Sequence, residues 1–442
     1  MDRCKLPCSV SLQKSNPYNH LNYCNMQLNK YSFGVGDRFA HQGEAQLRAF
    51  IIAAGEGVEI TPVWNKSNRE HLTVGSEPSG TRAAAEAAVR NSQWQKPWFA
   101  DADHINMSNV HRYIDSCDFF TIDVADYIGK KAGDAEISEF MEKFSAYAGK
   151  LTIPGIERPM DLTGGMLQAT AEKFLYAALQ AAEVYRYIES KKGKGNFITE
   201  VSMDEVAAPQ SPPELFFILG ALASENIPVD TIAPKFTGRF NKGVDYQGDI
   251  RQFALEFEQD LLVIDHAIKE FGLPEDLKLS IHSGSDKFSI YPVMGELIRK
   301  HNKGIHVKTA GTTWLEEVTG LAMAGGDALA MAIEIYGEAL LRFDELCGPY
   351  EAVIDIDSNR LPSEREVRSW DGSRLASALR HDPENPAYNP DMRQLLHVSY
   401  KIAAEKGNKF TGLLEKHRDI IGQEVTENIY ERHFRRIFDF RK

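Results

Sequence analysis

Residues 279–292 read LSIHSGSDKFSIYP, and this stretch indicates how the chain folds. A short apolar segment gives way at once to polar side chains, which is how an α/β barrel presents an active site at the end of a buried strand. Residues 305–312, IHVKTAGT, repeat the pattern. The two stretches place the imidazoles of His282 and His306 at successive strand ends, an arrangement that indicates a bound metal ion.

Working outward from this stretch, short apolar segments alternate with helical patterns from residue 31 onward. Such alternation is typical of repeated strand–helix units. We expect eight strands, the number that closes a barrel. They are Tyr31–Val35, Val58–Val63, Trp98–Ala102, Phe119–Ile122, Phe197–Val201, Thr231–Pro234, Lys278–Ile281 and Ile305–Val307. The predicted fold class is α/β, a (β/α)8 TIM-like barrel over residues 31–315.

Three regions fall outside the eight repeats. Residues 1–30 are polar, and we expect them to form an N-terminal arm or a lid segment. Residues 128–196 are too many for one crossover helix and predict a helical insertion that partly covers the barrel mouth. Residues 316–442 continue a helical pattern, which predicts a C-terminal helical cap on the barrel.

Composition limits the partners and the cellular compartment that we expect for this protein. The net charge of −13 over 442 residues argues against nucleic acid and membrane as partners, because both favour a basic face. Five cysteines without a regular spacing are typical of a reducing compartment, and no signal sequence is evident, so we expect a cytoplasmic protein. The sequence leaves open whether the chain forms a homo-oligomer.

Polar and ionisable side chains follow all eight predicted strands, where a parallel barrel keeps its catalytic groups. The metal hypothesis depends on His104, His282 and His306. Three imidazoles, or two with a carboxylate, hold a divalent transition metal and leave one position open for a substrate. The sequence does not distinguish zinc, manganese, nickel, cobalt and iron. His104 follows Asp103, and strand alternation points these two side chains to opposite faces unless the strand has already turned.

Two further groups of side chains complete the predicted site. Carboxylates near a barrel axis can exchange protons with a substrate, because burial raises their pKa toward neutrality. The candidates are Asp103, Glu200, Asp204 and Glu205. Cationic groups after the last three strands can hold a carboxylate or a phosphate, although we expect at least two of them to form a solvated face. These are Lys235, Arg239, Lys242, Lys287 and Lys308.

Several blocks of the sequence resemble the tagaturonate epimerase family. In chain order they are GVGDR at 34–38, DADH at 101–104, FTID at 120–123, EVSMDE at 200–205, KGVDY at 242–246, HSGSDKF at 282–288, HVKTAG at 306–311 and RQLLHV at 393–398. The resemblance implies a divalent-metal-dependent enzyme of hexuronate catabolism. Its substrates would be D-tagaturonate and D-fructuronate, two small sugar acids that differ only at C4.

The resemblance also implies roles for individual residues. His104, His282 and His306 would bind the metal. Asp103 and Glu200 would serve as base and acid, in either order, with Asp204 in reserve. The substrate carboxylate would be held by Lys242, Lys287 and Lys308, supported by Ser283, Ser285 and Asp286. His397, in a helical segment, could reach into the site from the cap, but structural hydrogen bonding is the favoured role.

Two mechanisms stay open. In a retro-aldol route, a base removes the C4 hydroxyl proton, the C3–C4 bond breaks, and the bond re-forms on the other face of the rotated aldehyde. In an enediol route, the carbonyl migrates until the stereocentre is α to it, and its proton is exchanged. A metal-dependent sugar-acid isomerase or aldolase on the same barrel is the alternative enzyme. A non-catalytic sugar-acid-binding protein is disfavoured, because a sensor does not need the carboxylates beside the predicted ligands.

Overall fold

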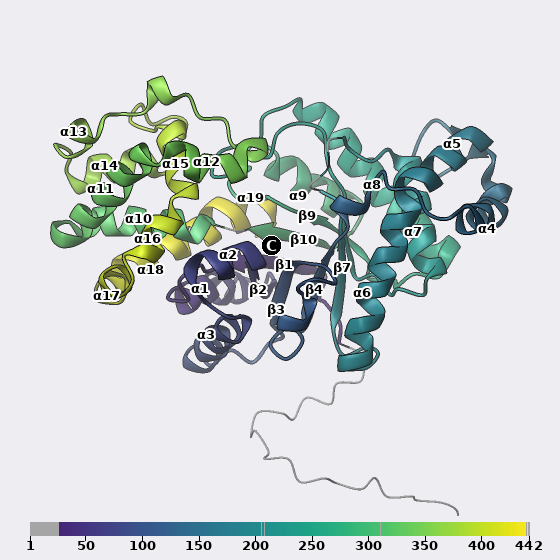
Figure 1. Cartoon of the computed structure of the whole chain (residues 1–442), viewed down its shortest axis with the longest axis horizontal. Coiled ribbons are helices and arrows are strands. Elements are labelled where there is room, and N and C mark those ends of the chain that lie inside the picture. Colours follow the sequence, from purple (N-terminus) through teal and green to yellow (C-terminus); the bar gives the residue numbers. More distant parts are fainter. Residues whose placement is uncertain (1–25, 205, 207, 310, 439, 441–442) are drawn as a thin grey trace, which may run out of the picture.

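Eight parallel strands form a closed barrel in the order β1-β10-β9-β8-β7-β4-β3-β2 (Figure 1). The computed structural model describes residues 26–438, except 205, 207 and 310, together with Phe440. The strands are β1 (Tyr31–Gly36), β2 (Thr61–Ser67), β3 (Phe99–Ile105), β4 (Phe119–Asp123), β7 (Ile198–Ser202), β8 (Thr231–Ala233), β9 (Lys278–Ile281) and β10 (Ile305–Thr309). The predicted α/β barrel is therefore confirmed.

The largest difference in strand bounds is at β2, which continues beyond the predicted end at Val63 to Ser67. The added part of the strand includes two polar residues, Asn65 and Lys66, and both are buried. The Lys66 ammonium donates to the Arg38 carbonyl at 2.6 Å, and the Asn65 amide donates to the Thr309 carbonyl at 3.3 Å. Buried polar groups are tolerated when they are hydrogen-bonded, so the strand can carry them into the barrel.

Helices cover the outside of the barrel and fill the spaces between consecutive strands. They are α1 (Gly43–Gly55), α3 (Pro78–Asn91), α6 (Tyr176–Lys192), α7 (Pro212–Ser224), α8 (Ile250–Phe271) and α9 (Tyr291–Lys300). The longest, α8, begins at Asp249, whose carboxylate accepts from the amides of Arg251 and Gln252 and so caps the helix. Its buried face presents Phe253, Phe257 and Leu261 to the barrel.

The described part of the N-terminal arm, residues 26–30, closes the end of the barrel where the strands begin. Leu28 is buried and packs against Val63, Phe99 and other residues near the starts of the strands. The buried ammonium of Lys278 donates to the carbonyls of Leu28 and Asn29, at 2.9 and 2.7 Å. Residues 26–30 therefore plug the barrel where its strands begin, which is the opposite end from the barrel mouth. The lid interpretation is wrong for these residues. Residues 1–25 lie outside the described residues.

The insertion at 128–196 is helical, as predicted, with a small hairpin. It contains α4 (Asp134–Phe144), the antiparallel pair β5 (Gly149–Leu151) and β6 (Met160–Leu162), α5 (Gly164–Thr170), a π-helical turn η4 (Ala171–Leu175) and α6. In Figure 1 α4 and α5 project beside α7, and the Phe144 ring contacts Phe217 of α7. Among the described residues, none from this insertion lines the main cavity of the barrel mouth, so the insertion supports the side of the barrel.

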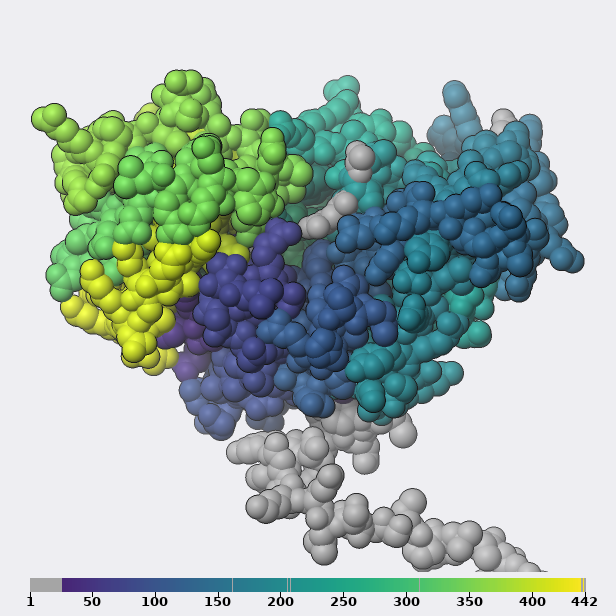
Figure 2. Space-filling view, viewed as in Figure 1, coloured from purple at the N-terminus to yellow at the C-terminus, as the bar shows by residue number. Residues whose placement is uncertain are grey.

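The C-terminal helical region has two parts. One extends outward from the barrel and contains α10 (Thr312–Ala324), α11 (Gly326–Leu341), α12 (Phe343–Cys347), α13 (Glu364–Val367), α14 (Gly372–Leu379), α15 (Pro390–Val398), α16 (Tyr400–Glu405) and α17 (Asn408–Lys416). The other contains α18 (Arg418–Glu427), the π-helix η7 (Asn428–Phe434) and α19 (Arg435–Ile437). Figure 2 shows the C-terminal end of the chain (yellow) lying against the first strands and helices of the barrel (purple).

The second of these parts completes the outer layer of the barrel. Phe434 packs edge-on against Phe33 of β1 and Phe50 of α1, with ring centroids 5.0 and 4.9 Å apart. On the other side, the backbone of Ile437 lies so close to Gly295 of α9 that a side chain at Gly295 would overlap it. The last helices thus fill the space between α1 and α9, and only the first part acts as the predicted cap.

The described residues contain no helix with the length and apolar character that a bilayer span requires. Of the five cysteines, Cys117 and Cys347 are buried free thiols. Cys4, Cys8 and Cys24 lie outside the described residues. The expected reducing compartment stays a prediction.

Candidate active site

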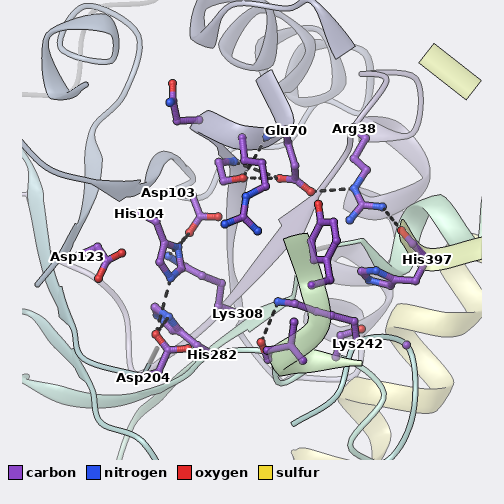
Figure 3. Close-up of a pocket in the computed structure, with 18 of the residues that line it drawn as sticks. Arg38, Glu70, Asp103, His104, Asp123, Asp204, Lys242, His282, Lys308 and His397 are labelled. Atoms are coloured by element: carbon purple, nitrogen blue, oxygen red, sulfur yellow. Dashed lines mark hydrogen bonds and ion pairs between the residues drawn. The ribbon is translucent and has the colours of Figure 1, made fainter. Parts of the chain in front are cut away.

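A cavity of about 420 Å³ lies at the C-terminal ends of the barrel strands (Figure 3). Side chains at or beyond the ends of all eight strands line it, and the C-terminal helical region adds Tyr350, Val353 and His397. This is the face on which parallel α/β barrels carry their active sites. The cavity therefore defines the candidate active site.

His104 reaches the cavity because β3 is irregular at its end. The pairing of β3 with β4 shifts register between Ala102 and Ile105, and His104 adopts a φ of 55°. This bulge brings Asp103 and His104 to the same side, and the Asp103 Oδ1 atom lies 2.7 Å from His104 Nδ1. The strand has therefore already turned, which was the condition for both residues to enter the site.

His282 directly follows β9 and is held by carboxylates on both ring nitrogens. Its Nε2 lies 2.7 Å from Oε1 of Glu200, which belongs to β7. Its Nδ1 lies 3.1 Å from Oδ1 of Asp204 and 3.3 Å from the Ser202 hydroxyl. The ring is thus fixed by groups at the end of β7.

Asp204 joins the two imidazoles. Its Oδ1 atom is 3.7 Å from Nε2 of His104 and 3.1 Å from Nδ1 of His282. Among the described residues, these three side chains form a group whose potential ligand atoms all lie within 4.8 Å of one another. We call His104, Asp204 and His282 the histidine end of the cavity. Asp204, predicted as a reserve acid, takes the place of the third ligand.

His306 does not belong to this group, which corrects the predicted ligand set. It is the second residue of β10 and pairs in register with Ser280, two residues before His282. Two residues along a strand correspond to about 6.6 Å, so His306 lies one layer deeper in the barrel. Its Nδ1 is 2.9 Å from the Ser32 hydroxyl, and its ring packs against Phe119. Burial lowers the pKa of its imidazole to about 3.

Lys308 lies among carboxylates, and its ammonium group forms ion pairs with them. Its Nζ is 2.7 Å from Asp101, 2.9 Å from Asp103 and 3.1 Å from Glu200. Burial lowers the Lys308 pKa, but these carboxylates outweigh burial and raise it well above its usual value. Burial also raises the pKa of the Asp101 carboxyl, to about 7. Lys308 lines the cavity as a fixed positive charge, and not as the free carboxylate clamp that was predicted.

The carboxylates Asp103 and Glu200 differ in access to the cavity. Asp103 lines it, whereas Glu200 is fully buried behind His282 and does not. Burial alone would raise the pKa of the Glu200 carboxyl, but Lys308 and His282 outweigh burial and hold it well below its usual range. Glu200 can therefore act on a substrate only indirectly, through His282 or Lys308. Glu205 lies outside the described residues.

Lys287 and Asp286 both fix loops. Lys287 also lines the cavity, in agreement with its predicted place, whereas Asp286 does not. The Lys287 ammonium donates to the carbonyls of Asn241, Val244 and Ser285, at 2.7 to 2.9 Å. Burial lowers its pKa to about 7. Asp286 is buried away from the cavity, and its Oδ2 accepts from Arg393 at 3.1 Å. These two residues hold the loops after β8 and β9 in place.

Lys242, Ser283 and Ser285 line the cavity as predicted. The Lys242 ammonium lies 3.1 Å from the Ser283 hydroxyl. Ser285 lines the cavity too, but its hydroxyl donates to Asp286 at 3.1 Å. The remaining cations, Lys235 and Arg239, do not line the cavity, and Arg239 pairs with Asp355 at the surface at 2.9 Å. Among the predicted cations that line the cavity, Lys242 thus has fewer competing partners than Lys287 and Lys308.

Arg38 and Glu70 line the cavity but were not among the predicted site residues. The Arg38 Nε atom lies 2.8 Å from Glu70 Oε1, and its guanidinium stacks on the Tyr400 ring at 3.9 Å. Glu70 belongs to α2 (Asn68–Val74), where it forms a capping box with Ser67. The spacing S-x-x-E is a sequence signal for such a helix start. No comparable signal predicts that Glu70 pairs with Arg38.

The cavity has a second end, formed by Arg38, Lys242 and His397, which we call the cationic end. Figure 3 shows it on the opposite side of the cavity from the histidine end. The two ends differ in charge. Carboxylates surround His104 and His282, whereas Lys242 and the ion pair of Arg38 with Glu70 accompany His397.

Comparison with known proteins identifies the family of this chain. The family model described as tagaturonate epimerase matches residues 9–437. The chain belongs to the tagaturonate epimerase family. It is therefore an enzyme of the isomerase class, as expected from the sequence. The match extends beyond the blocks that carried the resemblance and includes the last helices.

Individual relatives of the family agree. The chain is 28% identical over 413 residues to the tagaturonate/fructuronate epimerase of Thermotoga maritima, covering 90% of this chain and 79% of that protein. The native crystal structure of fructuronate-tagaturonate epimerase from Cohnella laeviribosi superposes with a TM-score of 0.75 at 24% identity, covering 93% of this chain and 82% of that one. The crystal structure of the same enzyme with one bound glycerol superposes with a TM-score of 0.77. These structures confirm the fold of the tagaturonate epimerase family for this chain.

Proposed function

We propose that this enzyme interconverts D-tagaturonate and D-fructuronate, with a divalent metal ion held by His104, Asp204 and His282. The observation that carries the proposal is the convergence of two imidazoles and one carboxylate in the cavity of a chain that belongs to the tagaturonate epimerase family. The cavity volume of about 420 Å³ falls in the range of small-molecule sites.

The residues of the histidine end fit a metal ion. An imidazole binds a metal through one nitrogen while its other nitrogen donates to a neighbour, often a carboxylate. His104 has Asp103 on Nδ1, and its buried Nε2 has no hydrogen-bond partner among the described residues. His282 has Glu200 on Nε2 and turns Nδ1 toward Asp204. Two nitrogens and one oxygen are the donors of a catalytic site that keeps an open position.

The ion would supply Lewis-acid polarisation of a substrate carbonyl and hydroxyl. The chain supplies the remaining functions. Asp103 is the base in this proposal, because it is the member of the predicted acid–base pair that lines the cavity. Burial raises the pKa of its carboxyl, but Lys308 and His104 outweigh burial and hold that pKa well below its usual range, contrary to the expected rise toward neutrality. Asp103 is therefore ionised at neutral pH and can accept a proton. Glu200 acts indirectly, by orienting His282. Lys308 contributes a fixed positive charge beside the site where negative charge develops on substrate oxygen.

Both mechanisms, retro-aldol cleavage and enediol proton exchange, use these same groups. In the first, Asp103 would take the proton of the C4 hydroxyl as the C3–C4 bond breaks, and return it after the bond re-forms on the other face. In the second, it would exchange a carbon-bound proton. The substrate carboxylate would lie at Lys242 and Ser283, whose polar atoms line the cavity on the other side.

The test is incubation of the purified protein with D-tagaturonate and the metal in deuterated water, followed by NMR. We expect D-fructuronate with all six carbons retained. Deuterium at the stereocentre supports the enediol route, and its absence supports the retro-aldol route. Release of three-carbon fragments without an epimer would instead identify an aldolase, and no conversion of the sugar acid would contradict the proposal.

A further inference from the structure

His397 is a buried histidine that the proposed chemistry does not use. It lies on α15 of the C-terminal helical region, and its side chain lines the cavity at the cationic end. Figure 3 shows its ring beside Lys242 and Arg38. The expected structural hydrogen bond is not seen at Nδ1, which is buried and has no partner among the described residues.

The position of His397 is specified by the surrounding structure. Arg393, one turn earlier on α15, donates through Nε to the Gly243 carbonyl at 2.6 Å and through Nη2 to Asp286 at 3.1 Å. These contacts bind α15 to the loops that carry Lys242 and Ser283. At the other end of the helix, Arg38 donates to the His397 carbonyl at 2.9 Å. The ring therefore enters the cavity from a fixed backbone.

An unpartnered buried nitrogen in such a fixed position indicates a missing ligand. Leaving a buried polar atom without a hydrogen bond is costly, and native structures seldom do so. Burial lowers the pKa of the His397 imidazole well below its usual value, and the charges of Arg38 and Lys242 lower it further. The ring is therefore neutral at pH 7, so one nitrogen can donate a hydrogen bond.

We propose that His397 is a substrate-contacting residue whose Nδ1 donates a hydrogen bond to the carboxylate of the sugar acid beside Lys242. This inference depends on the proposed function and adds the orientation of the substrate. The carboxylate lies at the cationic end, and the reacting carbons lie at the histidine end. The C-terminal helical region then selects acidic over neutral sugars.

The test compares three substitutions of His397. His397→Leu removes the polar atoms at similar size, His397→Asn keeps a polar atom near the position of Nδ1, and His397→Gln keeps one near Nε2. Steady-state kinetics are measured for D-tagaturonate and for the neutral ketohexose of the same stereochemistry. Calorimetry measures D-fructuronate binding directly, and thermal unfolding with metal analysis reports whether each variant is folded and loaded.

We expect His397→Leu to raise KM for the acid about 10- to 100-fold, the range for one hydrogen bond to a charged group. Its kcat should change little, and the neutral sugar should be affected far less. His397→Asn should recover much of the loss, and His397→Gln should not. Calorimetry should show the same order of affinities.

Several results would overturn the inference. These are an unchanged affinity for the acid in His397→Leu, an equal loss for acid and neutral sugar, and an equal loss in the Leu and Asn variants. Measuring both binding and conversion of the acid by the wild-type protein distinguishes failure of this inference from failure of the proposed function. If wild type binds the acid but does not convert it, the proposed function fails, and the calorimetric comparison still decides the role of His397.

Discussion

The two ends of the cavity are built in different ways. The histidine end comes from the barrel alone, since His104 lies at the end of β3, and Asp204 and His282 follow β7 and β9. The cationic end joins the barrel to the C-terminal helical region, because Arg38 and Lys242 meet His397 of α15. In the proposed function, the barrel therefore supplies the chemistry and the docked helices complete substrate recognition. Changes at one end should therefore leave the function of the other intact.

The largest effect is expected from His282→Ala. Loss of one of three ligands should remove the bound metal and lower turnover about a thousand-fold or more, because Lewis-acid stabilisation supplies several kcal/mol. Elemental analysis of the purified variant and an epimerisation assay measure the two effects.

The matched control is His306→Ala, an imidazole one layer deeper in the same barrel. It should keep its metal and lose about 2–4 kcal/mol of unfolding free energy, through the cavity that the missing ring leaves. A metal-free His306→Ala variant, or a fully loaded His282→Ala variant, would show that the ligand set is wrong.

The Glu200→Gln variant tests whether Glu200 orients His282 or transfers a proton itself. A neighbour that orients a metal-bound imidazole contributes about 10- to 100-fold to metal affinity or activity. We expect the variant to bind metal that much more weakly and to regain most of its turnover when excess metal is added. A rate that stays about 10²–10⁴-fold low at saturating metal would identify Glu200 as a proton-transfer residue.

Arg393→Leu should disturb the cationic end while sparing the histidine end. Asp286 would be left buried without its partner, and breaking a buried ion pair costs about 3–5 kcal/mol. We expect lower stability in denaturant unfolding and a raised KM for the sugar acid, with metal content unchanged. Arg393→Lys keeps the charge and should lie between this variant and wild type. Loss of metal from Arg393→Leu would mean that the two ends are coupled.

The smallest effect is expected from Gly311→Ala. Gly311 has a φ of 82°, and a Cβ atom there would lie 2.7 Å from Arg38 Nη2 and would overlap Nε2 of His397. The strain is about 1–2 kcal/mol, and the displaced ring should raise KM several-fold. Gly407→Ala is the control, because Gly407 also has a positive φ, of 54°, but has no atom within 4 Å of an added Cβ. Equal kinetics for the two variants would argue against contact with His397.

The sequence predicted the barrel and part of the histidine end for a physical reason. A polar residue that directly follows an apolar strand, such as His282, must lie at the barrel mouth. The error at His306 came from register, because residues at similar places in two sequence segments lie in different layers when the strands are staggered. The bulge that turns His104 inward has no sequence signature of its own.

The cationic end was less predictable because it depends on tertiary contacts. Arg38 was visible at the end of the first predicted strand, but its partner Glu70 belongs to a helix of a different repeat. His397 enters the cavity only because Arg393 binds α15 to the loops after β8 and β9. Periodicity predicts the helix that carries His397, but not the surface on which that helix docks.

Metal removal and return tests the central claim most directly. The protein is stripped with a strong chelator, its metal content is measured, and epimerisation of D-tagaturonate is followed as divalent metal is titrated back. The account predicts that activity is lost on stripping and returns in full at about one equivalent per chain, the stoichiometry of a single three-ligand site. Undiminished activity in metal-free protein would contradict it.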